Sequence, residues 1–356
     1  MKKWKAALIA VVVGGVVITS IVSNVNASNQ GAKLESKKFK NTEIEYKSDF
    51  GVIWDIIKER FSIERKVPVP VKDIPVLPMT SQQIMDAPNN SAVKLGHSSI
   101  MLKLEGQIVM IDPVFSDRAS PVQWAGPKRF HQPPIAIKDI QEIDVVIISH
   151  DHYDHLDKGT IKAIKDKVGT FLVPLNVGKH LVDWGVAAEK VVELDWWQSK
   201  QVGGVEFTAT PTQHFSGRGL LDRDETLWAS WVINSPESKI FFSGDSGYFG
   251  GFKEIGEKFG PFDLTFIETG AYNRLWSEIH MVPEESVQAH LDLQGKVMVP
   301  IHNSTFDLAM HDWFEPLDRV SELSRQQQVT LSTPIVGEFI DVLNAPAENT
   351  WWLAVK

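Results

Sequence analysis

The sequence predicts an α/β (α+β) protein in which strands dominate and helices are interspersed between them. Short apolar runs, such as residues 144–150 and 297–302, are typical of buried strands. Residues 283–293 have the spacing of a helix, with Pro283 in its first turn. Hydrophobic residues make up 43% and charged residues 23% of the 356, which is the composition of a globular chain.

Composition also restricts the possible functions. The formal net charge is −9 and no basic block follows the N-terminus, which argues against a nucleic-acid partner. The absence of cysteine excludes disulfides, a cysteine nucleophile and thiolate metal ligands. Any metal site must therefore use histidine and carboxylate ligands, and the chain contains eleven histidines.

Residues 1–27 are typical of a targeting segment. Three lysines precede an apolar stretch over residues 6–22, and Val25 and Ala27 fit a signal-peptidase cut after Ala27. The apolar stretch is also just long enough to span a bilayer. A cleaved signal peptide and a retained membrane anchor both remain open, and either one predicts an exported or membrane-anchored protein.

Residues 28–88 are expected to connect this segment to the main domain, residues 89–356. Residues 28–48 are polar and predict a linker, residues 50–63 predict an amphipathic helix, and residues 67–78 predict an extended, Pro-punctuated strap. The apolar residues of the helix are Phe50, Ile53, Trp54, Ile57 and Phe61. The helix either packs on the main domain or lies on a membrane surface.

The main domain contains an alternating series of strand and helix patterns. Residues 91–113 predict two strands around the turn Glu105-Gly106, and residues 228–245 predict a hairpin with a polar turn at 235–238. Further strands are expected at 144–150, 171–175, 191–194, 205–211, 264–270 and 297–302, and helices at 157–167 and 283–293.

A histidine-rich loop follows the buried strand that begins at Asp144. Three histidines and two aspartates occur there within six residues, namely His150, Asp151, His152, Tyr153, Asp154 and His155. A turn can direct His150 and His152 to one centre, and Asp154 and His155 to a neighbouring centre. Imidazole and carboxylate are the ligands that suit zinc when no thiolate is present, although the same groups bind Mn, Fe or Co.

Three more candidate ligands follow apolar strands: His214, Asp245 and His302. If Asp245 bridges, these residues complete two four-ligand sets. The first set is His150, His152, His214 and Asp245, and the second is Asp154, His155, His302 and Asp245. Two divalent cations that share a carboxylate lie about 3.5–4 Å apart and lower the pKa of a bridging water, so that hydroxide exists near neutral pH. Hydrolysis then needs no protein nucleophile.

The motif is similar to that of the metallo-β-lactamase superfamily, in which His-x-His-x-Asp-His opens the site and later His, Asp and His residues complete it. Between about residues 90 and 320 the chain further resembles N-acylphosphatidylethanolamine-hydrolysing phospholipase D and its bacterial relatives. The strings that carry this resemblance are LGHSS at 95–99, DPVFSDRASP at 112–121, GPKRF at 126–130, SHDHYDHLD at 149–157, ELDWW at 193–197, SGDSGY at 243–248, FGPFDL at 259–264, GAY at 270–272 and HMVPEE at 280–285.

This resemblance implies a four-layer αβ/βα sandwich with two divalent metal ions, expected to be Zn²⁺, at one edge. It also implies hydrolysis of N-acylphosphatidylethanolamine to an N-acylethanolamine and phosphatidic acid. The amphipathic helix and the apolar N-terminal segment agree with a lipid substrate and a membrane surface as partners. The chain departs from the family at Asn303 and Ser304, where Trp and Gly are common, and at residues 273–276. Both departures lie near the expected substrate entrance, so substrate identity is less firmly implied than metal chemistry.

Four residues near the predicted ligands have secondary roles in this scheme. By resemblance, His280 lies at the rim of the active site, where it contacts a phosphoryl oxygen or helps to protonate the leaving group, while Asp154 is treated as both ligand and catalytic residue. His97 is expected in a turn of the first hairpin, orienting a ligand from outside the coordination sphere. Asp112 is expected to brace the metal loop through backbone bonds, and Tyr153 to line the pocket or pack.

Two other functions fit the same residues. A metal-dependent lactonase or small-ester hydrolase needs the same stabilisation of a charged intermediate. A deep apolar groove beside the metals would favour the phospholipase, and a small basic pocket would favour the lactonase. A non-catalytic metal- or lipid-binding protein is the third alternative, and the seven filled ligand positions argue against it.

Overall fold

The computed structural model describes residues 12–13, 16–17, 38–44, 50–219 and 221–356. Within the predicted targeting segment, only Val12–Val13 (β1) and Val16–Val17 (β2) are described, as a short antiparallel pair. The remainder of residues 1–27 lies outside the described residues. In the described part of the chain, no helix combines the length and the apolar character that crossing a membrane requires.

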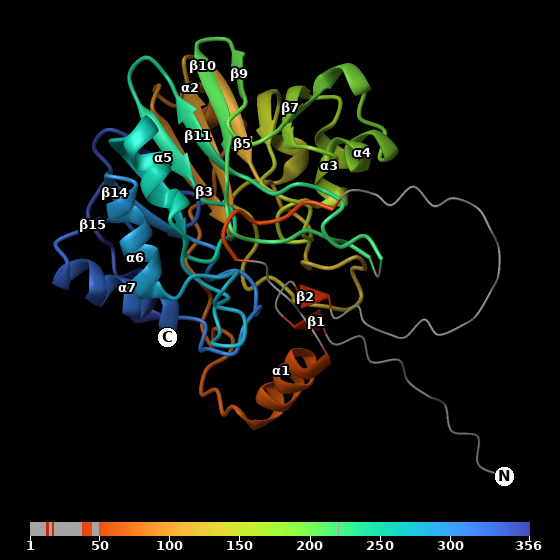
Figure 1. Ribbon diagram of the computed structural model, residues 1–356. Helices are drawn as coiled ribbons and strands as arrows, with labels where there is room; N and C mark the ends of the chain where they lie inside the picture. Colours follow the sequence, from red (N-terminus) through yellow and green to blue (C-terminus); the bar gives the residue numbers. More distant parts are fainter. Residues whose placement is uncertain (1–11, 14–15, 18–37, 45–49, 220) are drawn as a thin grey trace, which may run out of the picture.

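Two seven-stranded mixed sheets form the centre of the molecule (Figure 1). The first sheet contains, in spatial order, β16 (Phe339–Asp341), β3 (Ser91–Gly96), β4 (Ser99–Leu104), β5 (Gln107–Ile111), β6 (Ile143–Ile147), β7 (Val168–Pro174) and β8 (Val191–Leu194). The second contains β15 (Thr330–Leu331), β14 (Gly295–Ile301), β13 (Phe262–Glu268), β12 (Lys239–Phe242), β11 (Ser230–Asn234), β10 (Val205–Thr210) and β9 (Ser199–Val202). In each sheet one half is antiparallel and the other half is parallel.

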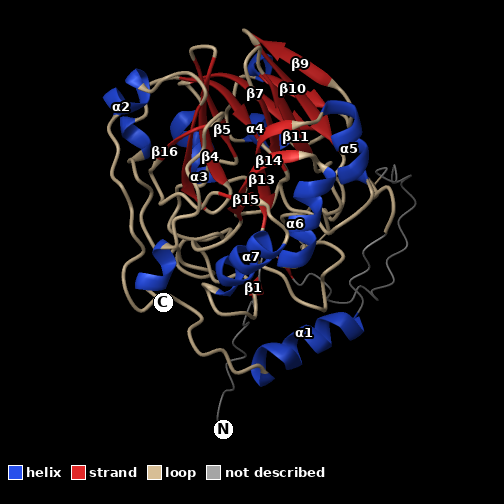
Figure 2. Ribbon diagram, turned by 90° about the vertical axis from the view of Figure 1, so that its left-hand side faces the viewer, coloured by secondary structure: helices blue, strands red, loops and turns tan. Residues whose placement is uncertain are grey.

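Helices cover the outer face of each sheet, which gives the four layers of the predicted αβ/βα sandwich (Figures 1 and 2). The helices are α1 (Phe50–Ser62), α2 (Ser81–Asp86), α3 (Lys158–Ile164), α4 (Gly178–Asp183), α5 (Gly251–Phe259), α6 (Pro283–Asp292) and α7 (Glu315–Gln326), with short 3₁₀ turns at Ile137–Asp139, Ala188–Lys190 and Trp351–Ala354. Helices α2, α3 and α4 pack on the first sheet, and α5, α6 and α7 pack on the second. The fold class predicted from the sequence is therefore confirmed.

The main core lies between the two sheets. Side chains such as Ile111 and Val145 from the first sheet meet Phe207 and Phe242 from the second, and all four are fully buried. The strand over Ile143–Ile147 reads as an almost continuous apolar run because its two faces pack against this core and against α3. The fold thus directs the carboxyl ends of several parallel strands to one edge of the sandwich.

The first predicted hairpin differs from the structure. Residues 91–113 form three strands instead of two, because the first run breaks at His97-Ser98. Gly96 has φ +129° and His97 has φ +52°, so the chain turns there, at the position where His97 was expected in a turn. This turn places the His97 side chain beside the histidine-rich loop. The second predicted hairpin, β11–β12, pairs Asn234 with Lys239 as expected.

The segments before the main domain contact it closely. Helix α1 lies below the sheets in Figure 1 and buries Ile56 against the loops around the histidine cluster, whereas the predicted apolar residue Trp54 is 57% exposed. Part of the predicted linker is also packed on the main domain, since Asn41 hydrogen-bonds with the backbone of His214. The boundaries of the three predicted segments stay predictions.

Candidate metal centre

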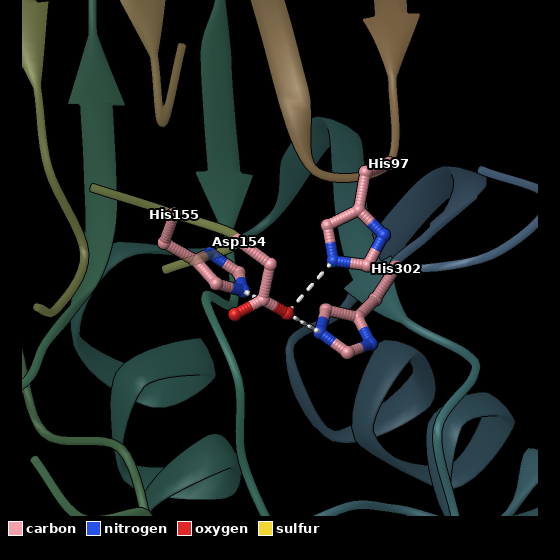
Figure 3. Close-up of side chains that lie close together, drawn as sticks. All are labelled: His97, Asp154, His155 and His302. Atoms are coloured by element: carbon pink, nitrogen blue, oxygen red, sulfur yellow. Dashed lines mark hydrogen bonds and ion pairs between the residues drawn. The ribbon is translucent and has the colours of Figure 1, made fainter. Parts of the chain in front are cut away.

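The seven predicted ligand side chains meet at the edge where the parallel strands end. His150, His152, His214 and Asp245 form one group of potential metal ligands, whose ligand atoms all lie within 4.8 Å of one another. His97, Asp154, His155 and His302 form a second such group (Figure 3). All eight side chains are buried, with at most 3% of any residue exposed. The convergence expected from the sequence is therefore present in the fold.

In the first group, imidazole nitrogens face one another directly. His150 Nε2 and His214 Nε2 lie 3.0 and 3.2 Å from His152 Nδ1. His214 donates its Nδ1–H to the carbonyl of Ile279, so its Nε2 carries only a lone pair. The Asp245 carboxylate lies 3.7 Å from His150 Nε2 and 3.8 Å from His214 Nε2. Lone pairs that converge in this way are stabilised by a cation between them.

The second group contains more carboxylate contacts. Asp154 Oδ2 lies 3.1 Å from His97 Nε2 and 3.2 Å from His302 Nε2, as the dashed lines in Figure 3 show. Asp245 lies 3.1 Å from both His155 Nε2 and His302 Nε2. Asp245 therefore contacts members of both groups.

Asp112 links the strand end to the histidine-rich loop. Its buried carboxylate accepts hydrogen bonds from the backbone N–H of Ser149 at 2.7 Å and from the Ser149 hydroxyl at 2.5 Å. It also accepts from His155 Nδ1 at 2.7 Å, which leaves His155 Nε2 directed at the centre. The Ser149 hydroxyl in turn contacts His150 Nδ1 at 2.9 Å. Asp112 thus braces the loop as predicted and additionally orients one imidazole ring.

Several buried polar atoms at this edge have no hydrogen-bond partner among the described residues. They are His97 Nδ1, His152 Nε2, His155 Nε2, Asp245 Oδ1 and His302 Nδ1. Burial of an unsatisfied polar atom costs on the order of 1–3 kcal/mol, so a cluster of them indicates a missing partner. His155 Nε2 and Asp245 Oδ1 are 3.1 Å apart but are not aligned as a hydrogen bond. A divalent cation bound by these atoms would satisfy both of them.

The electrostatics of the two groups differ. Burial lowers the pKa of His152 to about 4 and holds the pKa values of His150 and His214 well below the ordinary value. These rings are therefore neutral, which is the form that binds metal. Burial opposes protonation of His302 as well, but the charges of Asp245 and Asp154 outweigh it and raise its pKa to about 10.

The two aspartates of the centre remain ionised. Burial opposes ionisation of Asp245, yet the neighbouring His155 and His302 hold its pKa well below the usual range. The pKa of Asp154 is also held well below its ordinary value, with His155 as the strongest opposing charge. Five buried imidazoles with two carboxylates form a donor set that fits divalent metals.

The remaining predicted residues lie around this centre. His97 is closer than expected, since its ring centroid is 4.1 Å from that of His302 and its Nε2 contacts Asp154. His280 is buried with its ring centroid 5.1 Å from that of His214. The Tyr153 hydroxyl donates to the Arg218 carbonyl, its ring lies 4.2 Å from the Arg218 guanidinium, and the side chain lines a neighbouring cleft.

Sequence reasoning missed two residues of the site. Glu268, at the end of β13, is fully buried and hydrogen-bonds with His280. Its position after an apolar strand is the same signal that singled out Asp245 and His302. Asn41 makes two hydrogen bonds to the backbone of His214, at 2.8 and 3.0 Å. It lies in the segment predicted as a polar linker, and nothing in that sequence indicates a role in the site.

The cleft beside Tyr153 has a volume of about 580 Å³. Its lining combines cationic, aromatic and polar side chains, including Tyr153, Lys158, Lys162, His180, Trp184 and Arg218. The cleft therefore presents three cationic side chains, two carboxylates, Asp157 and Asp222, and two aromatic rings next to the histidine-rich loop.

This fold and this buried His/Asp cluster define a metal-dependent hydrolase. Residues 107–303 match the β-lactamase superfamily domain, and the chain belongs to the metallo-β-lactamase superfamily. An uncharacterized protein of Mycobacterium tuberculosis is 41% identical over 307 residues, which are 85% of this chain and 80% of that protein.

A second relative has a named activity. The N-acyl-phosphatidylethanolamine-hydrolyzing phospholipase D 1 of Caenorhabditis elegans is 35% identical over 277 residues, covering 74% of this chain and 78% of that protein. Among solved structures, the metallo hydrolase Igni18 of Ignicoccus hospitalis has a TM-score of 0.54 at 20% identity, covering 70% of this chain and 97% of that one. This structural similarity supports the fold.

Proposed function

We propose that the protein is a zinc-dependent phosphodiesterase of phospholipase D type that cleaves N-acylphosphatidylethanolamine to an N-acylethanolamine and phosphatidic acid. The observation that carries the proposal is the buried cluster of His and Asp side chains in a chain 35% identical to a phospholipase D with that substrate in its name.

In this proposal the first metal is held by His150, His152, His214 and Asp245, and the second by Asp154, His155, His302 and Asp245. The orphaned nitrogens and the absence of thiolate in the cluster support zinc as the metal. Bound divalent ions would supply hydroxide near neutral pH and neutralise the phosphodiester charge. His97 would remain hydrogen-bonded to Asp154 and fix the orientation of that carboxylate.

The protein's own residues would orient the substrate and exclude water. The ligand side chains are at most 3% exposed, so electrostatic interactions with a bound phosphate would be only weakly screened. The positive charges of Lys158, Lys162 and Arg218 in the neighbouring cleft would favour an anionic phospholipid head group. The aromatic rings of Tyr153 and Trp184 at the same cleft would contact acyl chains.

A membrane surface is the partner that we propose for the loop side of the molecule. Trp54 on α1 is 57% exposed and Lys58 lies 5.7 Å from its ring, a combination that suits the interface between lipid tails and head groups. We further propose that residues 1–27 export the protein or anchor it in the membrane. Sedimentation with phosphatidylglycerol vesicles, for the full chain and for Trp54→Ala, tests the first point; equal binding of both would contradict a role for this tryptophan.

The activity is tested with purified protein loaded separately with Zn²⁺, Mn²⁺, Fe²⁺ or Co²⁺ and supplied with N-acylphosphatidylethanolamine in mixed micelles. We expect N-acylethanolamine and phosphatidic acid, with the highest turnover for Zn²⁺. In H₂¹⁸O the label should enter phosphatidic acid, because hydroxide attacks phosphorus. Absence of products from every metal-loaded form, together with hydrolysis of a lactone panel, would replace the phospholipase with the lactonase.

A further inference from the structure

Glu268 is the least exposed carboxylate next to the centre that has no assigned role. The residue ends β13 and has no exposed surface. One carboxylate oxygen accepts the backbone N–H of Ser246 at 2.6 Å, and the other is hydrogen-bonded to His280 Nδ1. We infer that Glu268 is a positioning residue that turns the free nitrogen of His280 toward the substrate, where His280 protonates the leaving alkoxide. This inference rests on the proposed phosphodiester hydrolysis.

The backbone of Glu268 is fixed on both sides. Its N–H donates to the Ser243 hydroxyl at 2.9 Å, and its carbonyl accepts from the Ser286 hydroxyl at 2.7 Å. Ser243 and Ser286 belong to the loop that carries Asp245 and to α6, respectively. Since these contacts hold the main chain from two elements, the carboxylate keeps one orientation toward the centre. A buried carboxylate held in this way is well suited to orient an imidazole.

The carboxylate also connects three parts of the centre. It binds Ser246, which directly follows Asp245, and it binds His280. Its Oε1 lies 3.9 Å from His302 Nδ1. Ligand atoms of Asp245, Glu268, His280 and His302 all lie within 4.8 Å of one another. Displacement of Glu268 would therefore affect His280 first, because that ring depends on it for its only side-chain hydrogen bond among the described residues.

His280 lies at the boundary between the two ligand groups. Its ring centroid is 5.1 Å from that of His214 and 5.4 Å from that of His302. Nδ1 is used by Glu268, and within the described residues Nε2 has no hydrogen-bond partner. Nε2 is thus the ring nitrogen that can meet a substrate oxygen placed between these histidines. The direct Glu268–His280 hydrogen bond also argues against a metal ion between the two side chains.

The proposed step exchanges one P–O bond for another and transfers one proton. The oxygen of water forms the new P–O bond while the P–O bond to the alcohol breaks. The departing alkoxide takes a proton from His280 Nε2–H and leaves as the N-acylethanolamine. The Nδ1 proton stays between His280 and Glu268, so the hydrogen bond keeps the ring in one orientation during the transfer. His280 regains a proton from the water molecule that supplies the next hydroxide, so no other reactant is needed.

The experiment compares two leaving groups. An alkoxide such as that of N-acylphosphatidylethanolamine needs a proton, whereas p-nitrophenolate leaves without one. For Glu268→Gln and for His280→Gln we expect kcat to fall by roughly 100-fold with the lipid, but by less than about 5-fold with bis(p-nitrophenyl) phosphate. The double variant should be no slower than the slower single variant, because the two residues act as one unit.

A matched control is available on the same strand. Thr265 is also buried on β13 and contacts a buried histidine of α6, with 2.8 Å between Thr265 Oγ1 and His290 Nδ1. Thr265→Val removes this hydrogen bond away from the centre. We expect Thr265→Val to change the two substrates equally. Equal losses on both substrates for Glu268→Gln would overturn the positioning role.

Two measurements do not depend on turnover. A strongly deshielded ring N–H resonance of His280 is expected in the proton NMR spectrum of wild-type protein and of Thr265→Val, and should vanish in Glu268→Gln and His280→Gln. Metal content should be the same in all of these variants, and a lower content in Glu268→Gln would identify a metal ligand instead. If wild-type protein hydrolyses neither phosphodiester, the proposed function fails; the NMR resonance then still decides whether the pair exists.

Discussion

The two halves of the centre are built from the same residue types but are supported differently. In the half formed by His150, His152 and His214, two outward ring nitrogens contact neutral groups: His214 Nδ1 donates to the Ile279 carbonyl and His150 Nδ1 contacts the Ser149 hydroxyl. In the half formed by His155 and His302, both rings contact carboxylates: Asp112 accepts from the outward Nδ1 of His155, and Asp154, itself a candidate ligand, lies beside the inward Nε2 of His302. Consequently burial keeps the first half neutral, whereas nearby negative charge favours protons on the second.

This difference in charge means that the two halves of the site bind their cations under different proton conditions. The first half presents lone pairs and can bind a metal without releasing protons. The second half must exchange protons for its metal, so metal affinity there depends on pH. Asp245 is the residue that both halves share.

The largest effect is expected when the shared carboxylate is removed. Asp245→Asn should lower kcat/KM by more than about 1,000-fold, because both cations and several kcal/mol of transition-state stabilisation depend on it. Metal content by mass spectrometry should fall for both halves. Asp263→Asn, which alters a carboxylate on the same sheet that pairs with Lys296, is the control. Retention of two metals in Asp245→Asn would contradict the bridging position.

Removal of a carboxylate from one half should separate the two halves. Asp154→Asn is expected to reduce metal content to about one ion per chain and to abolish measurable turnover, because the remaining ion cannot clamp both reacting oxygens. Metal titration of this variant by calorimetry should show one class of site. Full activity with a single metal would mean that the two-metal scheme is wrong.

The supporting groups should have intermediate effects. Asp112→Asn is expected to weaken binding of one metal by about 10–100-fold, since the variant loses the charged partner of His155. Asn41→Ala removes only neutral hydrogen bonds around His214 and should weaken metal binding by less than about 10-fold. Competition with a chelator measures both. A larger effect for Asn41→Ala than for Asp112→Asn would reverse the comparison.

The smallest effect is expected in the pH dependence of the metal-free protein. Burial lowers the pKa of His152 to about 4, so the unfolded chain, with an ordinary value of 6.5, takes up the proton first. Stability should therefore fall as pH decreases from about 6.5 to about 4, by on the order of 3 kcal/mol for this group.

His302 should behave in the opposite way. Its pKa is raised to about 10, so its stabilisation is complete below about pH 6.5 and is lost as pH rises toward 10. Chemical unfolding in the presence of a chelator, between pH 4.5 and 9.5, tests both pH dependences of the free energy of unfolding. His152→Gln should lose the dependence at low pH, and His302→Gln the dependence at high pH. Parallel pH profiles for the two variants would show that the halves do not differ.

The sequence by itself determined the class of fold and most of the site. Periodicity and short apolar runs identified the central strands, and the dense motif from His150 to His155 indicated that its side chains bind metal together. His214, Asp245 and His302 could be added because each follows an apolar strand, and the ends of parallel strands meet at one edge. Local pattern is sufficient for such residues.

Only the tertiary structure decided which supporting groups reach the centre. Asn41 lies more than 170 residues from His214 in a segment with no apolar pattern, and only the docked chain reveals their contact. Glu268 became notable through its burial against His280. A turn at His97 was expected from the sequence, but its direct contact with Asp154 is visible only in the folded chain. Trp54 is exposed while Ile56 is buried, because the main-domain loops that contact α1, and not helical spacing alone, determine which face packs.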